Sequence, residues 1–83
     1  MSYLKPTKHT NLKYSIVNIS ANILKLLKEN SIIEYTELLD VLKQKIGEDV
    51  SEVFLLSLTF LYVHKKIEYI KDLDAIRLID ENI

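Results

Sequence analysis

Apolar residues recur at intervals of three and four between positions 15 and 29, the spacing that places them on one face of an α-helix. Ser15 precedes this pattern and is suited to be its N-cap, while Asn30 follows it and is suited to stop it. The sequence therefore predicts a first helix over residues 15–29. Its expected buried face contains Ile16, Ile19, Ile23, Leu26 and Leu27.

A short β-branched segment at residues 31–34 is expected to pair as an edge strand, and a second amphipathic pattern follows it. We expect this second helix to begin with Thr36 as its N-cap and to run to about Ile46. Gly47 is expected to end the helix by adopting the left-handed conformation, as glycine commonly does. The predicted buried face contains Leu38, Leu39, Leu42 and Ile46.

The third predicted helix, over about residues 50–66, is apolar almost all the way round. Asp49 and Glu52 have the spacing of a capping box at its start. On a helical projection its apolar residues form two arcs that only Ser57 and Thr59 separate. The first arc holds Phe54, Leu55, Leu58, Leu61 and Tyr62, and the second arc holds Val53, Leu56, Phe60 and Val63.

A helix with two apolar arcs must be covered on both sides, whereas a surface helix normally shows one apolar stripe. A domain of 83 residues buries only about 60–65% of the surface that its unfolded chain exposes, so its single core is small. Either the first helix and the hairpin enclose the second arc, or this arc contacts a partner or another copy. The second interpretation favours a piece of a larger assembly.

Two short segments after the third helix predict a β-hairpin, with a turn between them. Helix, short strand, helix, turn, helix and hairpin is the element order of a winged helix-turn-helix domain. We therefore expect a mainly α fold with a small β-hairpin. Residues 67–70 and 75–79 are the predicted strands, residues 1–12 an extended N-terminal arm, residues 13–80 a single winged-helix domain and residues 81–83 a tail.

Composition limits the chemistry that the chain can perform. It has no cysteine and a single glycine, which excludes thiolate nucleophiles, disulfides and glycine-rich phosphate-binding loops. His9 and His64 lie in different elements, and neither has a partner at a spacing that indicates a metal site or a catalytic triad. We therefore expect no enzyme activity, no metal or other cofactor and no small-molecule substrate.

Charge is divided unevenly along the chain. Residues 1–30 hold five lysines against one glutamate, whereas residues 31–83 hold six basic and eleven acidic residues. A helix that reads DNA offers Arg, Lys, Asn or Gln to base edges, and residues 50–63 contain none of these. We expect contact with DNA only indirectly, or non-specifically through the basic arm. The alternatives are a stand-alone winged-helix DNA-binding transcription regulator, dimeric through the third helix, and a toxin–antitoxin partner.

The longest apolar run is about half of the ~20 residues that a bilayer-spanning helix needs. The first residues also lack the apolar segment of a secretion signal. We therefore expect a cytoplasmic protein that makes no contact with membranes.

Several segments carry a resemblance to a known family. They are Pro6-Thr7-Lys8-His9, Ile23 to Leu27, Phe54, Leu58, Leu61-Tyr62 and Ile67-Glu68. With these segments the chain resembles the short middle components of bacterial ABC-three-component systems, among which are Lamassu-type defence operons. The resemblance extends from Leu4 to about Leu78, and its most specific part is the arm motif. In the family pattern a small residue or glycine stands where the third helix meets the hairpin, whereas this chain has Lys65 and Lys66.

The resemblance implies a small non-catalytic adaptor subunit between an SMC-like ABC ATPase and an effector, often a nuclease, in defence against phage or plasmids. We expect the arm and the second arc of the third helix to bind these larger subunits. The expected partner-binding residues are Tyr3, Leu4, Pro6, Thr7, Lys8, His9, Val53, Leu56, Phe60 and Val63.

Overall fold

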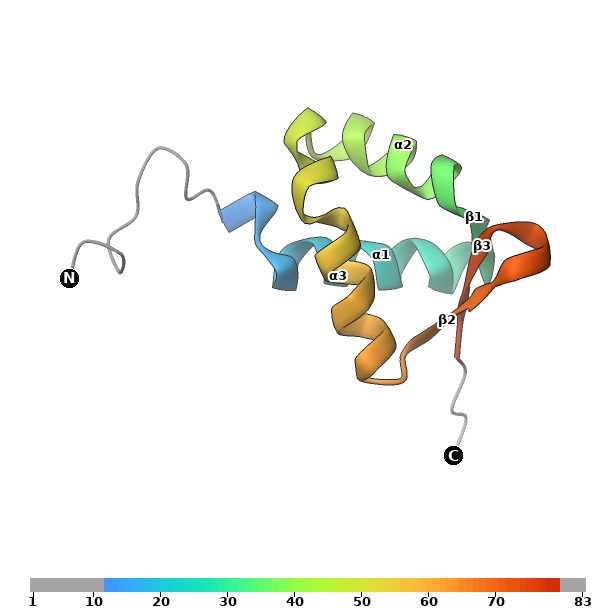
Figure 1. The fold of residues 1–83 in the computed structure, drawn as a ribbon. Coiled ribbons are helices and arrows are strands. Elements are labelled where there is room, and N and C mark those ends of the chain that lie inside the picture. Colours follow the sequence, from blue (N-terminus) through green and yellow to red (C-terminus); the bar gives the residue numbers. More distant parts are fainter. Residues whose placement is uncertain (1–11, 80–83) are drawn as a thin grey trace.

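The computed structural model describes residues 12–79, which form a mainly helical α+β protein with a small antiparallel sheet (Figure 1). The helices and strands, in chain order, are α1 (Ile16–Asn30), β1 (Ile32–Glu34), α2 (Tyr35–Lys45), α3 (Ser51–Val63), β2 (Ile67–Ile70) and β3 (Ala75–Leu78). Short 3-10 turns, η2 (Leu12–Tyr14), η3 (Glu48–Val50) and η4 (Lys71–Leu73), lie before α1, before α3 and inside the hairpin. The predicted arm, up to residue 11, and the predicted tail lie outside the described residues.

The sheet has three strands in the order β1-β3-β2, and both pairings are antiparallel. The predicted hairpin is confirmed, because β2 pairs with β3 and Tyr69 stands opposite Ile76. The predicted edge strand is also confirmed, because β1 pairs on the other side of β3 with Ile33 opposite Ile76. Ile76 therefore lies at the centre of the sheet, where it is buried.

The core lies where the three helices meet one face of this sheet. α1 packs against α3, and α2 closes the core on the remaining side (Figure 1). Every helix contributes residues at helical spacing, as the apolar pattern predicts. The buried apolar residues are Ile19, Ile23, Leu27, Ile33, Leu38, Leu42, Val50, Phe54, Leu58, Leu61, Ile67, Ala75 and Ile76.

The two predicted N-caps have different outcomes. Ser15 is confirmed as the N-cap of α1, because its Oγ accepts a hydrogen bond from the backbone N–H of Asn18 at 3.1 Å. Thr36 is wrong as the N-cap of α2, which begins at Tyr35 without a side-chain cap. The backbone N–H of Tyr35 instead donates to the carbonyl of Asp74 at 2.9 Å, so the hairpin satisfies the first turn of α2.

The loop from α2 to α3 also differs from the prediction. Gly47 has φ 152° and ψ 166°, which is not the left-handed helical conformation, although a residue with a Cβ rarely adopts it. A Cβ at this position would overlap the hydroxyl of Tyr14. The predicted capping box of Asp49 and Glu52 is wrong, because η3 continues directly into α3 and Val50, the N-cap, has helical dihedral angles and makes no side-chain bond. Sequence spacing could not reveal a 3-10 turn that makes such a cap unnecessary.

The junction of α3 with the hairpin has the geometry of a Schellman motif. The N–H of Lys66 donates to the carbonyl of Leu61 at 2.9 Å, and that of Lys65 donates to the carbonyl of Tyr62 at 3.0 Å. Lys65 has φ 60°, the left-handed conformation that glycine usually supplies at this place. The chain therefore turns sharply into β2 at a lysine.

Candidate functional site

The buried face of α3 consists of part of the predicted first arc together with Ser57. Phe54, Leu58 and Leu61 of the first arc are buried in the core, together with Ser57. Leu55 and Tyr62 belong to the same predicted arc but are 64% and 62% exposed. Only part of the first arc is therefore buried. The buried face also includes Ser57, a polar residue that the apolar pattern did not assign to the core.

Two serines let α1 and α3 approach each other. Ser20 and Ser57 are both buried, and the hydroxyl of Ser20 donates to the carbonyl of Ser57 at 3.4 Å. Within residues 12–79, the Oγ of Ser57 is buried and accepts or donates no hydrogen bond. The small side chain of Ser57 allows the two helices to pack closely, whereas a larger one would separate them. The cost is one buried hydroxyl without a hydrogen bond.

The second arc of α3 is exposed for most of its length. Leu56 is 55%, Phe60 41% and Val63 66% exposed, while Val53 is partly buried and packs against the core. The ring of Phe60 contacts that of His64, with centroids 4.5 Å apart. The first helix and the hairpin therefore do not enclose this arc.

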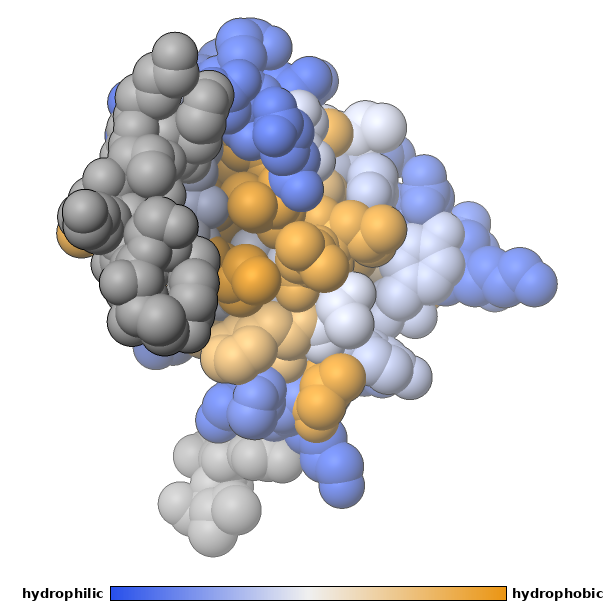
Figure 2. Space-filling view, turned by 60° about the vertical axis from the view of Figure 1, so that its left-hand side comes forward, coloured by the Kyte–Doolittle hydropathy of each residue, from blue (hydrophilic) through white to orange (hydrophobic). Residues whose placement is uncertain are grey.

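Leu55 and Tyr62 extend this exposed surface on the other side. In Figure 2, apolar side chains gather on one face of the molecule, and half of the large exposed apolar residues within residues 12–79 belong to α3. A contiguous apolar surface of this kind on a small protein is a mark of a contact surface.

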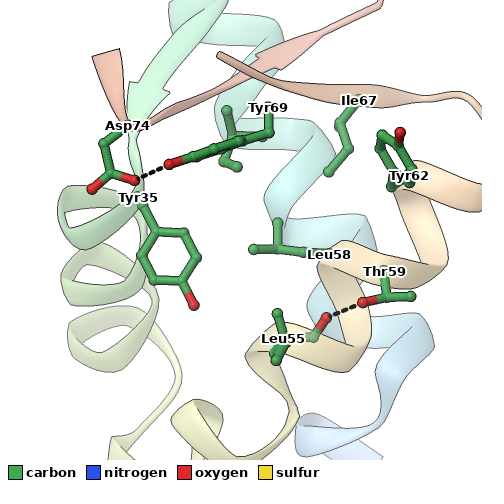
Figure 3. A pocket seen from close by; sticks show the side chains of 9 residues that line it. Tyr35, Leu55, Leu58, Thr59, Tyr62, Ile67, Tyr69 and Asp74 are labelled. Atoms are coloured by element: carbon green, nitrogen blue, oxygen red, sulfur yellow. Dashed lines mark hydrogen bonds between the residues drawn. The ribbon is translucent and has the colours of Figure 1, made fainter. Parts of the chain in front are cut away.

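A cleft of about 440 Å³ lies beside the exposed face of α3. It opens between α3, the beginning of α2 and the hairpin, and apolar or aromatic side chains form most of its wall (Figure 3). The ring of Tyr35 packs edge-on against Phe54 at 5.1 Å, which fixes one wall. The residues that line the cleft are Tyr35, Leu55, Leu58, Thr59, Tyr62, Ile67, Tyr69, Asp74 and Ile76.

One polar contact stands at the rim of this cleft. The hydroxyl of Tyr69 donates to Oδ1 of Asp74 at 2.7 Å (Figure 3). This hydrogen bond to the carboxylate raises the pKa of the Tyr69 phenol above its ordinary value of 10.0, and desolvation and the negative charge of Asp74 act in the same direction. Asp74 itself has φ 48° and ψ 52°, and its carbonyl accepts the N–H of Tyr35. One residue thus joins the turn of the hairpin to β2 and to α2.

The sequence did not predict this cleft. Tyr35, Tyr69 and Asp74 are far apart along the chain, and each one alone looks like an ordinary residue at the edge of an element. Only the pairing of β2 with β3 brings Tyr69 to the start of α2. No spacing rule within a single element would have found the cleft.

The remaining predicted site residues lie elsewhere. Tyr3, Leu4, Pro6, Thr7, Lys8 and His9 precede residue 12, so they lie outside the described residues. His64 is exposed at the end of α3 and contacts Phe60. Within residues 12–79, no three acidic or histidine side chains come together in a way that could hold a metal ion. No helix in this range is both long enough and apolar enough to cross a membrane.

The fold and this surface define a class: a small α+β protein in which one helix presents an exposed apolar face. Comparison with protein families makes the assignment specific. The chain belongs to the family described as ABC-three component (ABC-3C) system Middle Component 8, which matches residues 31–79. It is thus a middle component of such a system, and the family confirms the resemblance seen in the sequence.

The matched range begins after α1, although the resemblance was expected to begin at Leu4. The hairpin, the cleft and all of α3 lie inside the matched range, whereas the arm lies outside it. No curated protein and no solved structure matches the chain.

Proposed function

We propose that this protein is a non-catalytic winged-helix adaptor that joins an SMC-like ABC ATPase to an effector in a bacterial defence system of the Lamassu type. The order of elements and the sheet order β1-β3-β2 support a winged helix-turn-helix, with α3 as its third helix and β2-β3 as its wing. Membership of the middle-component family supports interaction with the other components of the system. The sequence resemblance supports an ATPase and a nuclease-like effector as the two partners.

The exposed second arc of α3 carries this proposal. Leu56, Phe60 and Val63 present apolar surface to solvent, and burial against a partner stabilises a complex by about 25 cal/mol per Å² of apolar surface. Val53 extends the arc towards the core, so the surface is rigidly connected to the fold. We propose that a larger subunit of the complex covers this arc.

The chemistry of α3 favours a protein partner over DNA. Its exposed side chains include no Arg, Lys, Asn or Gln, which are the residues that bind base edges. The hairpin turn adds Asp72 and Asp74 against one lysine, Lys71, so its net negative charge would repel phosphate. We therefore propose that DNA is contacted only indirectly, or non-specifically by the basic arm, rather than by α3 as in a stand-alone regulator.

Replacement of Leu56 tests the proposal. In Leu56→Glu a charge replaces an exposed leucine, so the fold should be retained while burial against the partner becomes unfavourable. We expect affinity for the ATPase subunit, measured by co-purification and titration calorimetry, to fall by at least about tenfold, because a buried leucine contributes about 1.5–3 kcal/mol.

Val17→Glu is the matched control, since Val17 is an exposed apolar residue of α1 rather than of α3. It should bind the ATPase as the parent chain does. Equal binding by Leu56→Glu, with unchanged circular dichroism, would show that the second arc is not the contact surface.

A further inference from the structure

A second stripe on the exposed side of α3 runs along the edge of the cleft. Glu52, Leu55, Thr59 and Tyr62 follow one another at intervals of three, four and three residues, which places them on one face of the helix. All four are exposed. We call them the Leu55 stripe. Leu56 and Phe60 of the second arc lie beside it rather than in it.

The two ends of α3 carry opposite charges. Glu48, Asp49 and Glu52 are exposed at its beginning, and Lys65 and Lys66 are exposed just after its end. Each of these groups also suits the dipole of its own helix terminus. The dipole does not account for the exposed apolar residues between the two ends.

We propose that α3 pairs antiparallel with α3 of a second copy of the chain, across a two-fold axis at Thr59. Glu52 and Lys66 are equally far from Thr59 along the sequence. Because α3 ends at Val63 and the chain turns at Lys65, antiparallel pairing centred on Thr59 brings Glu52 of each copy to the basic end of the other helix, where Lys65 and Lys66 are exposed. In an antiparallel pair the acidic beginning of each helix lies beside the basic end of the other. In a parallel pair, charges of the same sign would lie side by side.

Thr59 suits the position on the axis. Its hydroxyl donates to the carbonyl of Leu55 at 2.9 Å, so burial in an interface leaves no unsatisfied donor (Figure 3). Its small side chain lets two helices approach closely at their crossing point. Leu55 and Tyr62 stand on either side of it and supply the apolar contact.

The cleft beside the stripe supports the same arrangement. Leu55, Thr59 and Tyr62 form the α3 wall of the cleft, so a helix that lies along the stripe also covers its mouth. Side chains from the second copy can then bury apolar surface of Tyr35 and Tyr69 as well. Leu56 and Val63 stand three residues before and four residues after Thr59, so this contact adjoins them as well, while Phe60 lies further round the helix and stays open to the larger subunits of the complex.

Charge reversal tests the pairing in the full chain. We expect the parent chain to be a dimer by sedimentation equilibrium, and Glu52→Lys or Lys66→Glu each to weaken dimerisation by about tenfold or more through like-charge repulsion. The double variant Glu52→Lys with Lys66→Glu restores opposite charges across the axis, so it should dimerise as the parent does. Glu37→Lys, an exposed acid in the first turn of α2, is the control that should change nothing.

Cross-linking tests the position of the axis. Because the chain has no cysteine, Thr59→Cys supplies a single thiol. The two thiols of a dimer should form a disulfide across the axis on mild oxidation, whereas Thr36→Cys, an exposed threonine of α2, should not.

A parent chain that is monomeric at all concentrations would overturn the pairing. So would a dimer that ignores both single reversals, or one that the double reversal does not restore. Binding of the ATPase subunit is measured separately, so these results leave the adaptor proposal to its own test.

Discussion

At the scale of single residues, the most telling position is Lys65. The third helix can turn into β2 only through a left-handed residue, and Lys65 takes that conformation with φ 60°. This conformation costs a residue with a Cβ about 1–2 kcal/mol relative to glycine. Glycine, which has no Cβ, would adopt this conformation without that cost.

Replacement of Lys65 by glycine should stabilise the protein. We expect Lys65→Gly to raise the free energy of unfolding by about 1 kcal/mol, or the melting temperature by about 4–8 °C. Glycine has no Cβ, so it adopts the left-handed conformation without steric strain. Lys65→Ala removes the same charge but keeps the Cβ, so it should show no such gain. Thermal melts of the three chains would decide the matter, and equal gains in both variants would assign the effect to charge.

At the scale of elements, helices could be predicted far better than the contacts between their ends. The interval of three and four residues is a property of one segment, so α1, α2 and α3 appear in the sequence at nearly their observed bounds. The start of α2 does not, because its first N–H bonds to the carbonyl of Asp74 in the hairpin. The burial of Ser57 and the exposure of Leu55 also depend on how closely α1 approaches, which no single segment encodes.

The hairpin gives a pH-dependent prediction. The Asp74 carboxylate stabilises the protonated phenol of Tyr69 and raises its pKa, so this contribution to stability is complete below the ordinary pKa of 10.0 and is lost as the pH rises through the folded-state pKa. In Asp74→Asn, the pKa of Tyr69 should fall back towards 10.0, and this part of the alkaline loss of stability should disappear.

Ultraviolet titration of tyrosinate, with Tyr69→Phe as the reference chain, measures this pKa. Asp72→Asn is the matched control, since the pKa of Tyr69 responds to Asp74 rather than to its neighbour. A pKa that is the same in Asp74→Asn and in the parent chain would mean that the hydrogen bond at the rim of the cleft does not persist in solution.

At the scale of the whole molecule, the chain combines a small core with more exposed apolar surface on α3 than its own elements cover. The Leu55 stripe adjoins the second arc on α3, with Phe60 further round the helix, so in our proposals α3 contacts a second copy along one edge and a large subunit along the other. The basic arm adds a third contact in our proposal, and an extended arm gains order on binding at an entropic cost that its contacts must exceed.

The arm is tested by the double variant Lys8→Ala with His9→Ala. Since both residues belong to the arm that we propose as a contact for the ATPase subunit, we expect the affinity for that subunit to fall while the melting temperature hardly changes. Lys25→Ala with Lys28→Ala, two exposed lysines of α1, is the control for general loss of positive charge. Unchanged affinity, measured by calorimetry, would show that the arm is only a tail.

The contact of Tyr14 with Gly47 connects these scales. Tyr14, the last residue of η2, packs against the core and places its hydroxyl where a Cβ at Gly47 would stand, in the loop that leads to α3. In our proposal a subunit binds the arm just before η2, so its binding site adjoins the contact between Tyr14 and the loop from which α3 begins.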